Sequence, residues 1–137
     1  MKPVLEQSEH PLTAKDLEEL EARLGRPLPP AFKEYYLCYN GGYLPEDREG
    51  NALIVGGFDS IRYGRLPAEQ LYADLLESFE QLELLFPFAY DQGGNNFLIS
   101  LRDQPDYGSI YIWLMDLQEL ELAAESFGNF LDFLQEE

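Results

Sequence analysis

Apolar residues recur at helical spacing in four segments of the chain. In the first, the three leucines from Leu17 to Leu24 lie on one narrow stripe of a helix. Thr13 stands at the expected N-cap, Asp16 stands three positions later as in a capping box, and Gly25 is placed to end the helix. The same spacing predicts further helices over 31–39, over 68–82 and after Ser126.

Alternating or short apolar runs between turn residues predict strands over 52–58, 96–101, 109–115 and near 119–123. A polar turn over 102–108 joins the middle two into a hairpin. Residues 43–50 are expected to form an exposed acidic loop, and residues 85–89 to lead into a turn over 90–95. Two helices precede the strands, one interrupts them and one follows. Because regular β-α-β alternation is missing, this order predicts an α+β domain with a largely antiparallel sheet.

The two faces of the predicted hairpin differ in character. If the register brings the apolar sets of the two strands to one face, that face carries the aliphatic and phenyl side chains of Phe97, Ile99, Leu101, Ile110, Ile112 and Leu114. The other face carries Leu98, Ser100, Arg102, Tyr111, Trp113 and Met115. We weigh two interpretations of this second face. Either it is a second small core covered by loops or by the 68–82 helix, or it is an exposed aromatic patch that anchors a partner.

The composition fits one domain in a reducing compartment. The chain has 137 residues, of which 45% are hydrophobic, and we expect a flexible leader over 1–12 and a single domain over 13–137. Cys38 is the only cysteine and His10 the only histidine, which excludes an internal disulfide and His/Cys zinc clusters. The N-terminus lacks a secretory h-region, and no apolar run is long enough to span a membrane. We expect a cytoplasmic protein.

The charge is large, negative and uneven. Residues 1–65 hold 11 acidic and 8 basic residues, whereas residues 66–137 hold 15 acidic residues and one basic residue, Arg102. A surface this acidic repels nucleic acid and anionic lipid, which bind through lysine and arginine. It attracts a basic protein. This asymmetry exceeds what solubility requires. Because self-repulsion opposes compaction, it also destabilises the folded chain, and attraction of a basic partner is a benefit that offsets this cost.

Several patterns suggest a ligand site, but none is specific. Residues 91–96 supply one carboxylate where an EF-hand needs several, so a turn fixed by two glycines is favoured. The Gly-Gly pairs lack the Lys-Ser or Lys-Thr of a phosphate loop. Chance carboxylate pairs are easy to find among 26 acidic residues. Cys38 is expected to be a small buried residue. We expect no catalytic residues, no metal and no cofactor.

An ordered set of short motifs begins with Leu-Gly-Arg-Pro-Leu-Pro over 24–29 and an aromatic helix that ends in Asn-Gly-Gly over 40–42. It continues through Pro-Phe-Ala over 87–89, the Gly-Gly turn over 91–95, Phe97–Ser100, Gly108–Trp113 and Ala124–Phe127. This set resembles the SUKH superfamily, also called the Smi/Knr-like domain. The resemblance implies helices around a single curved sheet. It also implies a bacterial immunity protein that neutralises a cognate toxin of a polymorphic or contact-dependent system, and such toxins are often nucleases.

Our leading hypothesis is therefore a binding module that occludes a basic toxin, and a nuclease is the case we favour. The alternatives are a non-enzymatic regulatory scaffold that binds a cellular protein, as the eukaryotic relatives imply, and an enzyme of unknown class. The candidate partner-binding residues, chosen on charge and expected exposure, are Glu46, Asp47, Glu49, Asp74, Glu77, Glu80, Asp91, Arg102, Asp103, Asp106, Tyr111 and Trp113.

Overall fold

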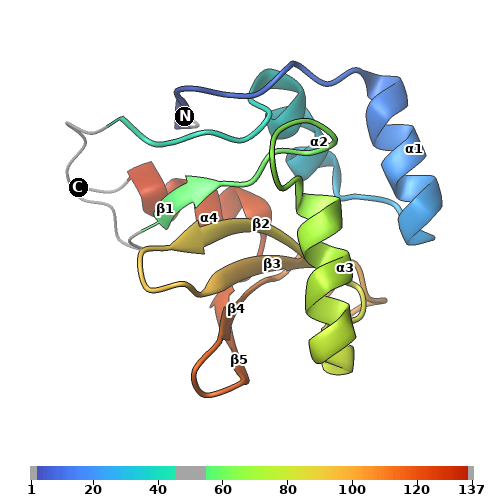
Figure 1. Cartoon of the computed structure of the whole chain (residues 1–137), viewed down its shortest axis with the longest axis vertical. Helices are drawn as coiled ribbons and strands as arrows, with labels where there is room; N and C mark the ends of the chain where they lie inside the picture. Colours follow the sequence, from blue (N-terminus) through green and yellow to red (C-terminus); the bar gives the residue numbers. More distant parts are fainter. Residues whose placement is uncertain (1–2, 46–54, 136–137) are drawn as a thin grey trace.

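A computed structural model describes residues 3–45 and 55–135. It contains four α-helices, a short 3₁₀ turn and one five-stranded sheet (Figure 1). The helices are α1 (Ala14–Leu24), α2 (Pro30–Cys38), α3 (Ala68–Ser78) and α4 (Phe127–Gln135), with the 3₁₀ turn η1 at Glu80–Leu82. The strands are β1 (Val55–Phe58), β2 (Leu85–Asp91), β3 (Asn96–Ser100), β4 (Ile110–Leu114) and β5 (Glu119–Ala124).

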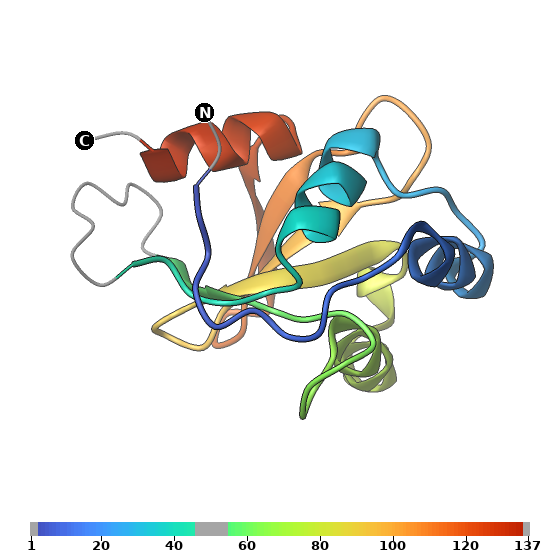
Figure 2. The same ribbon diagram turned by 90° about the horizontal axis from the view of Figure 1, so that it is seen from above.

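The sheet is antiparallel throughout and its strands lie in sequence order, β1 to β5. This confirms the predicted α+β class. Figure 2 shows α2 and α4 over one face of the sheet and α3 across the opposite face. No described helix is long and apolar enough to cross a membrane.

Local signals set both ends of α1 as predicted. The Thr13 side chain accepts a hydrogen bond from the Asp16 amide, the Asp16 carboxylate accepts one from the Thr13 amide, and Gly25 ends α1 at φ 74°. The third helix was expected to reach residue 82 but ends at Ser78. The backbone leaves the helix at Phe79, whose ring packs 5.0 Å from that of Trp113, centroid to centroid.

Strand β2 was missed at the sequence level, where part of it was taken as a lead-in to a turn. Residues 85–89 are buried on both faces of the sheet, so they show no alternation of apolar and polar residues. Pro87 also argues against a central strand, because proline donates no hydrogen bond to a neighbour. The structure accommodates Pro87 at a register shift between Pro87 and Ala89.

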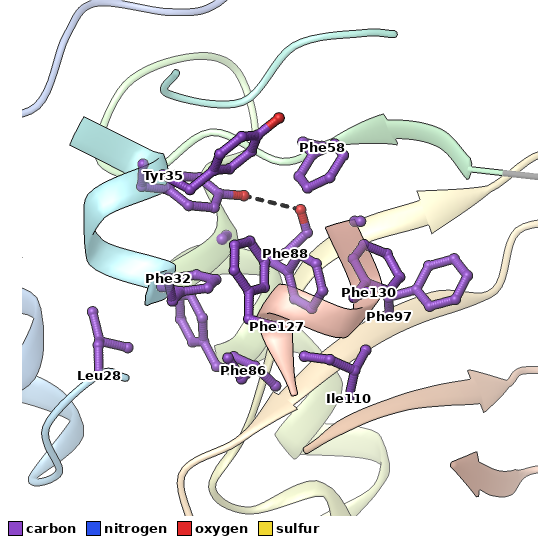
Figure 3. Packing of buried hydrophobic residues seen from close by; sticks show 14 of the residues in the cluster. Leu28, Phe32, Tyr35, Phe58, Phe86, Phe88, Phe97, Ile110, Phe127 and Phe130 are labelled. Carbon is purple, nitrogen blue, oxygen red and sulfur yellow. Dashed lines mark hydrogen bonds between the residues drawn. The ribbon is translucent and has the colours of Figure 1, made fainter. Parts of the chain in front are cut away.

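The aliphatic faces of β3 and β4 coincide, as predicted. Phe97 pairs with Ile112 and Ile99 with Ile110. These side chains face α2 and α4 and belong to the larger core. Figure 3 shows the centre of this core, where the Phe88 ring meets Phe32, Phe127 and Phe130 with centroid distances of 5.2–5.8 Å. The edge-on geometry of these pairs is favourable for aromatic rings.

The opposite face forms a second, smaller core beneath α3. Its buried members are Leu75, Leu82, Leu85, Leu98 and Trp113. Trp113 is 1% exposed, so the interpretation of this residue as part of an exposed patch is wrong and the alternative of a second core holds for it. The cause is tertiary, because α3 and the turn after it bring Leu75, Phe79 and Leu82 against the indole.

Residues 3–12, for which we expected a loose leader, lie against the domain. Leu5 and Leu12 are each 6% exposed, and Glu6 exchanges two backbone hydrogen bonds with Tyr43. Gly42 in turn bridges to Phe58 of β1. The apolar residues of this segment therefore complete the core, and its backbone is connected to the β1 edge of the sheet through residues 42–43.

Candidate functional site

The clearest acidic face among the described residues is the outer side of α3 and η1. Asp74, Glu77 and Glu80 are all exposed there, whereas Ala68 and Leu75 on the other side of the helix are buried. Asp74 accepts a hydrogen bond of 3.0 Å from the Gln70 amide group. The amphipathic pattern of the sequence thus places this group of carboxylates in solvent, as predicted.

Two side chains of the loop over 102–108 bind it to the connection between α1 and α2. Asp103 is exposed and forms an ion pair with Arg26 from the α1–α2 connection. The hydrogen bond from Arg26, together with its charge, lowers the pKa of Asp103 below its usual range. The phenol of Tyr107 donates a 2.8 Å hydrogen bond to the Pro27 carbonyl, which ties the same loop to the same connection.

Three of the candidate residues come together beside this loop. The Tyr111 hydroxyl donates to Asp106 Oδ2 at 3.1 Å, and the Arg102 guanidinium donates to the Gln81 carbonyl at 2.8 Å. Partial burial, reinforced by the Asp106 carboxylate, raises the pKa of the Tyr111 phenol. Arg102, Asp106 and Tyr111 are all partly exposed. They therefore form a polar rim next to the buried Trp113.

Asp91 stabilises the turn that joins β2 to β3. One carboxylate oxygen accepts hydrogen bonds of 2.9 Å from the amides of Gly93 and Asn95, and the other accepts one of 3.0 Å from the Asn95 side chain. Partial burial raises its pKa, but these hydrogen bonds outweigh that effect and lower it. The turn explanation of residues 91–96 fits this geometry.

The structure thus separates the predicted site residues into an α3 face, a rim at the 102–108 loop and a turn at Asp91. Glu46, Asp47 and Glu49 lie outside the described residues. The sequence analysis missed the exposed leucines around β5: Leu117 is 65% exposed and Leu122 is 58% exposed. The Glu-Leu-Glu-Leu alternation over 119–122 predicts that Leu120 and Leu122 share one face of a strand, but it gives no signal that Leu122 is left uncovered.

A groove of about 690 Å³ lies between α1, α3 and the loop before α3. Its lining is largely charged, and Arg62 spans it with ion pairs to Asp16 at 3.0 Å and Glu19 at 3.2 Å. Within residues 3–45 and 55–135, no cluster of three metal-ligating side chains occurs. Cys38, expected to be buried, is exposed at the last residue of α2. The groove holds an internal salt-bridge network, and its described lining residues include no nucleophile with an adjacent base.

The family assignment comes from comparison with known proteins. The model of the SMI1 / KNR4 family (SUKH-1) matches residues 11–132, which is most of the chain, so the protein belongs to this family. The family is known for proteins of the immunity type, which are in general binding proteins rather than enzymes. No curated protein matches the chain.

Proposed function

We propose that this protein is an immunity protein that binds and neutralises a basic protein toxin, with a nuclease as the favoured target. The observation that carries the proposal is a SUKH-1 family match in a chain whose residues 66–137 hold 15 acidic residues against a single basic one. A nuclease binds phosphates through lysine and arginine, so carboxylates can occupy the same groove and exclude the nucleic acid.

The distribution of ion pairs supports this assignment. The ion pairs recorded among the described residues use Arg26, Lys33 and Arg62, all from the first half of the chain. Arg102, the only basic residue after position 65, donates to a backbone carbonyl. Among the described residues no ion pair involves Asp74, Glu77 or Glu80, so the field of these carboxylates is available to a partner.

The test first asks whether a toxin gene lies beside this gene, as the proposal expects, and then measures neutralisation and association kinetics with that toxin. We expect the purified protein to abolish the activity of that toxin. We expect the association rate constant to fall tenfold or more between low and physiological salt, where the Debye length is about 8 Å. A neighbouring toxin that is bound with a salt-independent rate would contradict the steering argument.

Charge-reversal variants locate the effect. The test variant replaces Asp74, Glu77 and Glu80 with lysine, and the matched control replaces Glu6, Glu9 and Glu18, which are also exposed. Both change the net charge by the same amount. The α3 variant should slow association more than the control, because its charges lie in the more acidic half. No neutralisation, together with capture of a cellular regulatory partner, would favour the scaffold alternative.

A further inference from the structure

The two edges of the sheet differ in how they are covered. Along β1, Gly42 bridges to Phe58, and Tyr43 continues this contact to Glu6. Strand β5 pairs with β4 on one side, and among the described residues no backbone pairing lies on its other side. Figure 1 shows the β4–β5 hairpin at the margin of the molecule, beyond the reach of α1 and α2. An open strand edge is a ready template for another strand.

The direction of the free backbone groups follows from the register. The Ser100 amide donates to the Ser109 carbonyl at 2.9 Å, so the backbone of Ser100 faces β4. Since these directions alternate along antiparallel strands, Tyr111 faces β3 and Ile112 faces β5. Ile112 pairs with Glu121, so Glu121 faces β4. The Leu114 carbonyl accepts a hydrogen bond from the Gln118 amide at 2.7 Å, so the backbone of Leu114 also faces β5, as the alternation requires.

The backbone N–H and C=O groups of Leu120 and Leu122 therefore point to the open edge. Their side chains lie on the α3 face of the sheet, where Leu120 pairs with Trp113 and Leu122 with Tyr111. Leu120 is partly buried against the smaller core, whereas Leu122 is 58% exposed. The edge thus offers free hydrogen-bonding groups next to an uncovered apolar side chain.

The opposite side of the same edge is acidic. Glu119 and Glu121 are exposed and pair across the ladder with Leu114 and Ile112, so both lie on the α4 face. A strand laid along β5 would meet carboxylates on one face and Leu122 on the other. A second copy of β5 would bring like charges face to face, which is destabilising.

We infer that the open edge of β5 is a docking surface for an extended, basic segment of a partner protein. The segment would extend the sheet by backbone hydrogen bonds to Leu120 and Leu122, place lysine or arginine opposite Glu119 and Glu121, and place an apolar side chain against Leu122. The inference rests on the proposed function for the identity of the partner, and it adds the surface and the mode of binding.

The probe is a synthetic heptapeptide of alternating lysine and valine, added to the isotope-labelled protein. We expect chemical-shift changes along β5 and amide exchange at Leu120 and Leu122 slowed about tenfold or more at saturation. Two control peptides replace the valines by proline or the lysines by glutamate, and neither should bind in this way. Binding of the proline peptide with equal affinity, or shifts that gather on α3, would overturn the inference.

Variants separate strand pairing from general charge attraction. Leu122→Pro removes an outward N–H without breaking a bond to β4, so it should abolish binding, whereas Leu122→Thr keeps the N–H and should only weaken it. The pair Glu119→Lys and Glu121→Lys should weaken binding about tenfold or more. The pair Glu77→Lys and Glu80→Lys, with the same charge change, should leave the peptide-induced chemical-shift changes along β5 as they are in the wild type. Equal effects of both pairs would refute the location.

These outcomes are distinct from those of the toxin experiment. If both the wild type and Leu122→Pro neutralise the toxin, the docking role of the β5 edge is refuted and the proposed function is left intact. If the peptide pairs with β5 but the protein does not neutralise the toxin, only the proposal of a toxin partner is refuted. A dimer of the free protein that is lost in Leu122→Pro would also overturn the inference, because the edge would then serve self-association.

Discussion

Replacing Asp59 with asparagine should stabilise the protein, and the gain should grow with pH. Asp59 follows β1, and its backbone is held by a 2.7 Å hydrogen bond to the Phe88 carbonyl and a 2.8 Å hydrogen bond from the Tyr36 phenol. Its carboxylate oxygen Oδ2 is buried with no hydrogen-bond partner among the described atoms. Burial raises the pKa of Asp59 from 3.8 to about 7. The carboxylate is therefore costly at neutral pH.

The sign and size of the effect follow from linkage. Because the pKa is raised in the folded state, the stability contributed by this group is fully present below about pH 3.8 and is lost as the pH rises through about 7. The gap between the two pKa values corresponds to about 4 kcal/mol. Asparagine has no charge to bury, so the advantage of Asp59→Asn should increase by about 3 kcal/mol between about pH 4.5 and about pH 8.

Urea unfolding followed by the fluorescence of the buried Trp113 measures this difference across the pH range. Asp74→Asn, at an exposed carboxylate, is the matched control and should show a difference that changes little with pH. An Asp59→Asn advantage that is constant with pH would refute the reasoning. So would a variant that is less stable than the wild type at about pH 8.

Three further predictions concern the packing. Asn40→Ala should cost about 3 kcal/mol in urea unfolding, because the buried amide makes three hydrogen bonds to backbone atoms, and a cost under about 1 kcal/mol would contradict this. Gly42→Ala should lower the melting temperature more than Gly94→Ala. Both have positive φ, but only at Gly42 would a Cβ lie 2.5 Å from the Glu6 carbonyl oxygen, so equal losses would argue against a steric cause. Trp113→Ala should cost about 3–5 kcal/mol by thermal unfolding. Both variants remove a buried N–H without a described partner, but Trp113→Phe should cost less because it keeps an aromatic ring in the core, and equal costs would contradict that account.

The candidate site shows what charge patterns can and cannot predict. The helical spacing of Asp74, Glu77 and Glu80 against Leu75 was enough to place these carboxylates in solvent. The sequence could not distinguish Asp91, which caps its own turn, from Asp103, which pairs with a residue 77 positions away. Both are aspartates in polar loops, and only their partners differ.

The sequence by itself determined the features that depend on neighbours within a few residues. Thr13 and Asp16 start α1, Gly25 ends it, and short apolar runs between turn residues mark β3 and β4, because capping, positive φ and turn formation are local properties of the backbone. Only the tertiary structure decided that α3 covers Trp113 and that the outer edge of β5 has no strand beside it among the described residues. Burial and strand pairing depend on contacts between segments that are far apart in the chain. A local pattern therefore cannot predict which segment packs on a given side chain or strand edge.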